Sequence, residues 1–160
     1  MLIIPSGKPK IWDKNPDYGP TRAKYAYTGT FHCLAKTYAE MFSPDDYLIL
    51  SPKYGFLYPE DWVKKTYDVR FTLNGVNQHT ISLADLKKSW QEKTAQRKIA
   101  EIIMIGGKKY LPLMEQVLAA KIKISLPLAG SSGIGIMQQK LKKAIQEREP
   151  LADRTQNKQS

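Results

Sequence analysis

Four short apolar runs, each followed directly by a loop rich in glycine, serine or lysine, constrain this chain more than any other feature. The runs are LIIP (2–5), YLIL (47–50), IIMI (102–105) and ISLPL (124–128). Their length and content are typical of buried strands. Apolar residues at helical spacing occupy the segments between and after them, over about 31–42, 82–99, 110–118 and 134–147. This alternation predicts an α/β fold: a three-layer α/β/α sandwich with a mainly parallel sheet of about four to five strands.

One domain is expected from the length of 160 residues and the hydrophobic content of 42%, which suffice for a single core. We expect residues 1–147 to form it and the polar residues 148–160 to be a disordered tail. No apolar run approaches the roughly 18 residues of a membrane span, and no basic region precedes the short apolar start, so a signal peptide is not predicted. Cys33 is the only cysteine, which excludes an internal disulfide framework and a thiolate metal cluster. The expectation is a soluble cytoplasmic protein without a metal or other cofactor.

The net charge of +10 comes almost entirely from the C-terminal part of the chain. Residues 1–68 hold 9 basic and 8 acidic side chains, whereas residues 69–160 hold 16 and 7. A positive field of this size concentrates polyanions, so a nucleotide or nucleic acid is the expected partner, with DNA favoured over RNA. Lys87, Lys88 and Arg97, on the predicted helix, would contact the phosphate backbone without sequence preference. The alternative is a basic surface that serves only solubility.

The loops that follow the four predicted strands form the candidate site. In open α/β sheets the ligand crevice lies beyond the carboxyl ends of the strands, where SGKPK, SPKYG, GGKKY and AGSSG would meet. Glycine lets the backbone approach a ligand, serine offers a hydroxyl, and lysine binds phosphate. The predicted substrate-binding residues are Ser6, Lys8, Ser51, Tyr54, Gly55, Gly106, Gly107, Gly130 and Ser131. The competing interpretation is that the glycines only turn the chain and that Ser131 caps a helix.

The stretch SPKYGFLYPEDWVKKTYD (51–68) carries the predicted catalytic residues Lys53, Tyr67 and Asp68. Lys53 could hold a phosphate, and Tyr54 could stack on a base, because an aromatic face accepts any base. A carboxylate such as Asp68, in a partly desolvated pocket, activates water or stabilises a cationic, sugar-like transition state. Alternatively, the stretch is a surface loop in which the tyrosines pack and Asp68 caps a turn.

This stretch also carries a motif, S-x-KYG-L followed by YD, that resembles a family of small, poorly characterised bacterial and phage proteins. The motif comprises Ser51, Lys53, Tyr54, Gly55, Leu57, Tyr67 and Asp68 here. The resemblance extends to the serine loop after the first strand, to YTG-F (27–31) and to the late LAG (128–130) and GIG (133–135), so it spans roughly residues 2–146. More loosely, the motif is similar to a domain of archaeosine synthase and to uracil-DNA-glycosylase-like folds.

The resemblance implies a three-layer α/β fold with a pocket for a nucleobase or nucleotide. It does not imply uracil excision, because SGKPKIWD and AGSSG stand where uracil glycosylases carry motifs of the Gln-Asp-Pro-Tyr and His-Ser-Pro types. The leading hypothesis is an enzyme that hydrolyses the N-glycosidic bond of a nucleotide, free or in nucleic acid, with Asp68 as the group that activates water. The alternative is a non-catalytic nucleic-acid-binding or nucleotide-sensing module, such as a phage or host-defence accessory protein.

Overall fold

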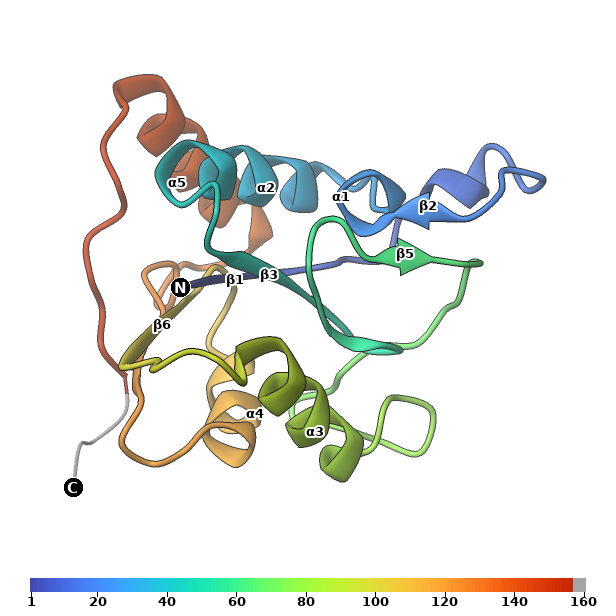
Figure 1. Cartoon of the computed structure of the whole chain (residues 1–160). Helices are drawn as coiled ribbons and strands as arrows, with labels where there is room; N and C mark the ends of the chain where they lie inside the picture. The colour runs from blue at the N-terminus through green and yellow to red at the C-terminus, as the bar shows by residue number, and fades with distance from the viewer. Residues whose placement is uncertain (157–160) are drawn as a thin grey trace.

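A five-stranded sheet forms the centre of the molecule. It is seen in a computed structural model that describes residues 1–156. The strands are β1 (Leu2–Pro5), β3 (Tyr47–Ser51), β4 (Gly55–Leu57), β6 (Glu101–Met104) and β7 (Lys123–Ser125), in the spatial order β4-β3-β1-β6-β7. All neighbouring pairs are parallel except β3 with β4. The predicted α/β sandwich with a mainly parallel sheet is therefore confirmed (Figure 1).

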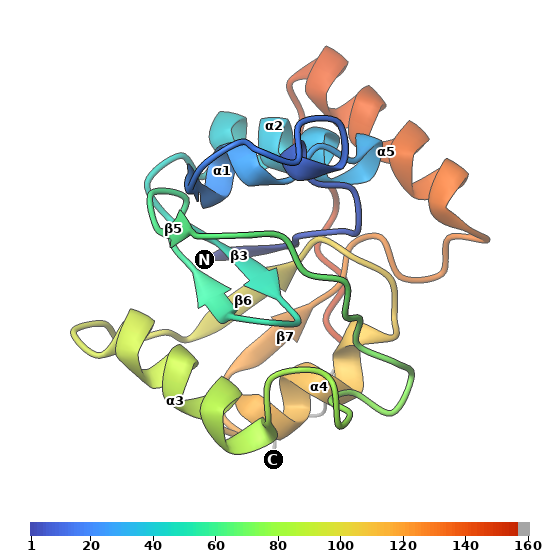
Figure 2. The ribbon, with the colours of Figure 1, turned by 90° about the vertical axis from the view of Figure 1, so that its right-hand side faces the viewer.

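Two pairs of helices cover the two faces of the sheet (Figures 1 and 2). The helices α2 (Thr30–Phe42) and α5 (Ile134–Glu147) lie on one face, and α3 (Leu83–Thr94) and α4 (Tyr110–Val117) lie on the other. Because β1 and β3 are buried on both sides, alternate residues enter different cores: Ile4 and Ile49 join the core under α2 and α5, whereas Ile3 and Leu48 join the other. This burial on both faces explains why the strands are uninterrupted apolar runs.

Strand β4 lies in a segment whose sequence favoured a loop. Gly55 has a φ of 79°, which a glycine adopts readily, and it turns the chain back so that Phe56 and Leu57 pair antiparallel with Leu50 and Ile49. Both apolar side chains are then buried. The chain thus gains an edge strand because the loop is short and two apolar side chains become buried. A search for long apolar runs in the sequence does not find such a strand.

A small antiparallel ribbon stands beside the sheet. Its strands are β2 (Thr21–Arg22) and β5 (Trp62–Val63), and it adjoins the short helices η1 (Ile11–Asp13) and α1 (Ala23–Ala26) (Figure 1). Val63 is fully buried, whereas the indole of Trp62 is exposed. The Gly- and Pro-rich segment 6–22 therefore contributes one of the two strands of this ribbon.

The segment after α5 differs from the disordered tail expected at 148–160. The backbone amide of Leu126 donates to the carbonyl of Arg154 at 2.9 Å, and the amide of Gln156 donates to that of Ile124 at 2.9 Å. Residues 153–156 thus lie against the otherwise open edge of β7, because backbone groups pair whatever the polarity of the side chains. The part of the predicted tail at 157–160 lies outside the described residues. Within residues 1–156, no helix is long and apolar enough to cross a membrane.

Candidate functional site

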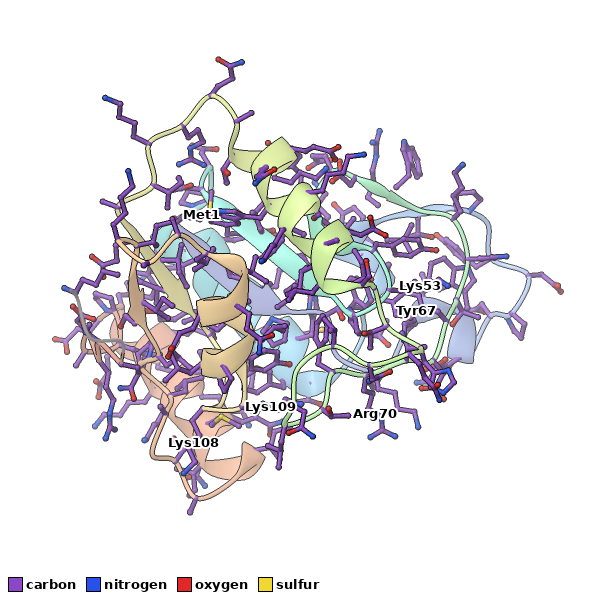
Figure 3. The ribbon with its side chains drawn as sticks, turned by 90° about the horizontal axis from the view of Figure 1, so that it is seen from below. Met1, Lys53, Tyr67, Arg70, Lys108 and Lys109 are labelled. Carbon is purple, nitrogen blue, oxygen red and sulfur yellow. The ribbon has the colours of Figure 1, made fainter. Side chains whose placement is uncertain are left out.

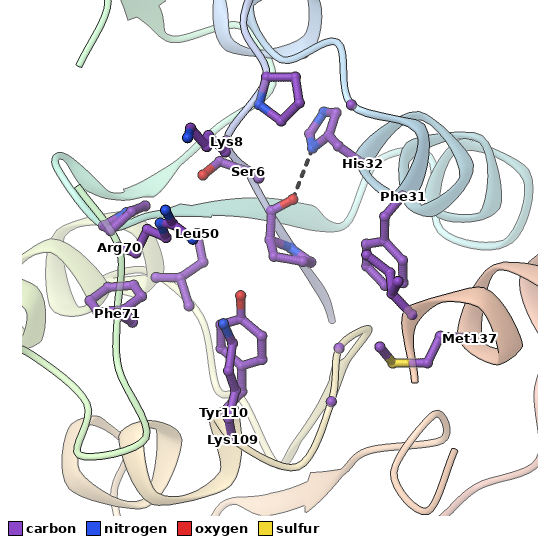
Figure 4. A pocket seen from close by; sticks show the side chains of 18 of the residues that line it. Ser6, Lys8, Phe31, His32, Leu50, Arg70, Phe71, Lys109, Tyr110 and Met137 are labelled. Atoms are coloured by element: carbon purple, nitrogen blue, oxygen red, sulfur yellow. Dashed lines mark hydrogen bonds between the residues drawn. The ribbon is translucent and has the colours of Figure 1, made fainter. Parts of the chain in front are cut away.

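A cavity of about 600 Å³ opens at the carboxyl ends of β1, β3 and β6. Its walls come from the loops after β1 and β6, the first turns of α2 and α5, and residues 69–71 (Figure 4). The chain leaves β1 toward β3 on one side, and β6 later pairs with β1 on the other side. Such a reversal of strand order leaves a crevice between the adjacent loops, which is where ligands bind in open α/β sheets.

The lining of this cavity is cationic and aromatic. The cations Lys8, Arg70 and Lys109 and the aromatic residues Phe31, Phe71 and Tyr110 all line it, and none of the described lining residues is an aspartate or glutamate. Figure 4 shows Lys8 and Arg70 on one side of the cavity and Phe31 with Met137 on the opposite side. A ligand that carries negative charge and a flat apolar ring fits this lining.

Three helices begin at the cavity without a side-chain cap. The residue that precedes the first turn is Gly29 for α2, Lys109 for α4 and Gly133 for α5, and none of them caps its helix through a side chain. In contrast, α3 begins elsewhere and has a cap, since the Ser82 hydroxyl accepts from the amide of Asp85 at 3.1 Å. In α4 the first amides are already used, since those of Tyr110 and Leu111 donate to the carbonyls of Gly107 and Lys108. The uncapped amides and positive dipole ends of α2 and α5 favour a bound anion.

Ser51, Tyr67 and Tyr27 form a cluster of hydrogen-bonded hydroxyls. The hydroxyl of Tyr67 lies 2.7 Å from the Ser51 Oγ and 2.6 Å from the hydroxyl of Tyr27. The ring of Tyr54 meets the ring of Tyr67 edge to face at 5.4 Å between centroids. Burial raises the pKa of Tyr67, so its hydroxyl stays protonated. These contacts fix the segment that carries Asp68, and the predicted direct catalytic role of Tyr67 stays a prediction.

Lys10 is a buried lysine that sequence analysis missed. Its side chain is 3% exposed, its Nζ donates to the carbonyl of Lys8 at 2.8 Å, and it lies 4.3 Å from the centroid of the Tyr67 ring. Burial lowers the pKa of Lys10, while the negative charges of Asp13 and Asp68 oppose this shift. The chain has 25 basic residues, and Lys10 lies in a Pro-rich stretch with no apolar periodicity. Its burial therefore gave no signal in the sequence.

His32 lines the cavity as a neutral residue. Its Nδ1 lies 2.9 Å from the carbonyl oxygen of Pro5 and must donate to it, because a carbonyl only accepts. Burial lowers the pKa of His32 to about 4. Its Nε2 and the Oγ of Ser6, which also lines the cavity, are buried and have no hydrogen-bond partner of good geometry among the described residues. The Ser6 hydroxyl nevertheless lies close enough to Tyr67 to contribute to the pKa of its phenol.

The predicted substrate-binding residues divide into two groups. Ser6, Lys8, Gly106 and Gly107 line the cavity. Ser51 and Tyr54 belong to the hydroxyl cluster, and Gly55 turns β3 into β4, where a Cβ would lie 2.7 Å from the Ser89 Oγ. Gly130 and Ser131 are not among the described lining residues, because the Arg154 guanidinium packs on Gly130 and the Lys140 Nζ donates to the Ser131 Oγ at 2.8 Å.

The predicted catalytic residues Lys53 and Asp68 are exposed and do not line the cavity in this structure. Asp68 lies on the segment that continues into the lining residues Val69 and Arg70. In the view from below, Arg70 appears between Lys109 and Lys53 (Figure 3). Sequence analysis did not single out Arg70, since only its place in the fold brings it to the cavity.

The predicted nucleic-acid-binding residues of the α3 region lie away from the cavity. Lys87 and Lys88 are exposed on α3. Arg97 follows that helix and forms an ion pair with Asp46 at 2.6 Å, which neutralises part of its charge. None of the three lines the cavity, so this group and the cavity are separate features of the surface.

Comparison with known proteins finds relatives whose function is also unknown. The chain is 43% identical over 152 residues to the uncharacterized protein YfjM of Bacillus subtilis (strain 168), an alignment that covers 94% of this chain and 98% of that protein. A model of a family of unknown function, DUF6884, matches residues 13–143, which include Arg70, Lys109 and the whole S-x-KYG-L and YD motif. The chain therefore belongs to the DUF6884 family.

Proposed function

We propose that this protein holds a nucleotide in the cavity, either free or as part of a nucleic-acid strand, and hydrolyses its N-glycosidic bond. The observation that carries the proposal is the lining: three cations, three aromatic rings and no acidic residue among the described lining residues, at the carboxyl ends of parallel strands. A nucleotide combines the two properties that this lining suits, an anionic phosphate and a flat, largely apolar base. The similarity of the S-x-KYG-L motif to a domain of archaeosine synthase supports the same class of ligand.

The phosphate would lie between Lys8, Lys109 and the uncapped starts of α2 and α5, since both ammonium groups and free amides stabilise it. The base would lie against Phe31 or Phe71, because an aromatic face stacks on any base. Burial raises the pKa of Tyr110 to about 12. Its hydroxyl is protonated at neutral pH and would donate a hydrogen bond to the ligand.

Asp68 is the carboxylate we assign to the reaction. In hydrolysis the C1′–N bond breaks, its electron pair goes to the base, and the base takes up a proton. Water adds to C1′ and gives a proton to Asp68, which returns it to solvent. The ionised carboxylate also stabilises positive charge on the sugar as the bond breaks. For Asp68 to act, C1′ would lie at the edge of the cavity formed by Val69 and Arg70, the lining residues that directly follow Asp68 in the chain.

The test is the release of free base. The purified protein is incubated with single nucleotides and with single- and double-stranded oligonucleotides, and both binding and released base are measured by mass spectrometry. We expect Asp68→Asn to abolish release while binding persists. Asp45→Asn is the matched control, because Asp45 is an exposed carboxylate before β3, at the opposite end of the sheet. Equal loss of release in the two variants would contradict the role of Asp68.

A second candidate function is non-catalytic nucleotide binding or sensing. It is favoured by one specific observation: Asp68 is exposed and lies outside the cavity lining. This candidate predicts binding that weakens when Lys8 or Arg70 is replaced by alanine, with no base released from any substrate. Release of base from any one nucleotide would rule it out.

A further inference from the structure

Residues 62–70 form an extended surface segment, which we call the strap, that runs from the β2–β5 ribbon to the cavity. In Figure 2 it crosses the face of the molecule in green, from β5 toward the loops after β1 and β6. Exposed and covered residues alternate along it except at Lys65. The exposed residues are Trp62, Lys64, Lys65, Thr66, Asp68 and Arg70. Val63, Tyr67 and Val69 are buried or half-buried and fix the strap to the molecule.

Trp62, at the start of the strap, is an exposed aromatic residue with a cation stacked on it. Its side chain is 55% exposed, whereas Trp12 and Trp90 are 4% and 6% exposed. The guanidinium carbon of Arg22 lies 3.9 Å from the centroid of the Trp62 ring, and the side chain of Arg22 is held by a hydrogen bond to the carbonyl of Glu60 at 2.7 Å. A large ring that is both exposed and oriented can stack on an unpaired base.

The strap also carries net positive charge, because it contains Lys64, Lys65 and Arg70 against the single acidic residue Asp68. The acidic residues next to the strap are paired, Glu60 with Lys24 and Asp61 with Lys93, both at 2.6 Å. Lys64 and Lys65 are exposed and form no ion pair with any described residue. Arg70, at the far end, lines the cavity. Cations therefore follow the strap from the ribbon to the cavity mouth.

We propose that the strap binds single-stranded nucleic acid, with one base stacked on Trp62 and the phosphates along Lys64, Lys65 and Arg70, so that a neighbouring nucleotide enters the cavity. This inference rests on the proposed function and names its substrate as a nucleotide within a strand. Interleaved aromatic and basic side chains bind single strands in this way. The strap spans eight residue steps, at most about 28 Å, which is long enough for several nucleotides and too long for one.

The first experiment uses the exposed tryptophan as its own reporter. A mixed-sequence single-stranded DNA octamer and the four deoxynucleoside monophosphates are titrated at low salt while tryptophan fluorescence is followed. The octamer should quench the fluorescence and bind at least tenfold more tightly than any monophosphate. Trp62→Ala should remove the quenching and weaken octamer binding by roughly 5- to 150-fold, while leaving monophosphate binding unchanged. Trp62→Phe, which keeps an aromatic face, should restore most of the affinity.

The second experiment separates the strap from general surface charge. Lys64→Ala/Lys65→Ala is compared with Lys142→Ala/Lys143→Ala, a pair of exposed neighbouring lysines on α5. Only the first double variant should weaken octamer binding markedly and reduce its dependence on salt. Equal effects of the two variants, or an octamer that binds no tighter than a monophosphate, would overturn the strap proposal. Monophosphate binding in the cavity would then leave the proposed function standing, whereas loss of binding by every nucleotide probe would overturn both.

Discussion

Titration of the buried His32 predicts a specific loss of stability in mild acid. Burial lowers the pKa of His32 to about 4 from its ordinary value of 6.5. The folded protein therefore binds fewer protons than the unfolded chain between these two values, and stability falls as the pH falls through that window. From about one unit above pH 6.5 both states hold an almost fully neutral ring, so His32 contributes little pH dependence there.

The size of this effect follows from the shift. One pKa unit corresponds to about 1.4 kcal/mol, so full protonation would remove about 3 kcal/mol of stability. Over the interval from pH 7.5 to pH 5 the expected loss is roughly 2 kcal/mol. Little screening by solvent is expected, because the side chain is 1% exposed. A loss of this size is a sizeable fraction of the net stability of a domain.

Urea unfolding at several pH values measures this loss of stability. Carboxylates also titrate in this range, so the wild type is compared with His32→Asn. The amide nitrogen of asparagine occupies the position of the His32 Nδ1 and can donate to the Pro5 carbonyl in its place. We expect the free energy of unfolding of the variant to depend less on pH by roughly 2 kcal/mol over the same interval. His79→Asn is the control, since His79 is the exposed histidine of the two. Parallel pH curves for wild type and His32→Asn, or an NMR titration of the His32 ring near pH 6.5, would refute the reasoning.

Three further predictions concern contacts that hold the site in place. Tyr67→Phe leaves the buried hydroxyl of Tyr27 without its partner at 2.6 Å and should lower the free energy of unfolding by about 1–3 kcal/mol; a change below 0.5 kcal/mol in urea unfolding would contradict the cluster. Gly55→Ala forces a side chain into a φ of 79° and within 2.7 Å of the Ser89 Oγ and should destabilise by more than about 1 kcal/mol, which thermal unfolding checks against Gly19→Ala at an open position. Arg154→Ala removes a 2.7 Å hydrogen bond to the backbone beside Gly130 and should increase hydrogen exchange at the β7 edge; unchanged exchange would show that this segment is held by other contacts.

The convergence of the loops at one end of the sheet could be predicted from the sequence, and the reason is physical. Parallel strands present their carboxyl ends at the same edge, so the loop after each apolar run comes to that edge whatever the details of packing. This is why Ser6, Lys8 and the glycines at 106 and 107 do line one cavity. Gly130 and Ser131 are not among the described lining residues, and the Arg154 side chain packs beside Gly130.

The residues that the sequence did not single out depend on contacts between distant parts of the chain. In the sequence Lys10 and Arg70 look like ordinary surface residues. In the structure Lys10 is buried over the Tyr67 ring, and Arg70 lines the cavity. The pairing of Trp62 with Arg22 joins residues forty positions apart. Periodicity contains no information on such contacts, because it reports only which face of an element is apolar.

The sequence by itself therefore determined the four parallel strands, the four helices that cover the sheet, the layered class of fold and the edge at which the loops gather, because each of these follows from local apolar periodicity and from the geometry of parallel strands. Only the tertiary structure decided which side chains lie together at that edge. It decided which hydroxyls are hydrogen-bonded to Tyr67 and which cations line the cavity. Those outcomes depend on the burial and the mutual distance of residues far apart in the chain. Burial and distance set the pKa of His32 and Lys10 and the chemistry of the cavity, and they exist only once the layers have packed.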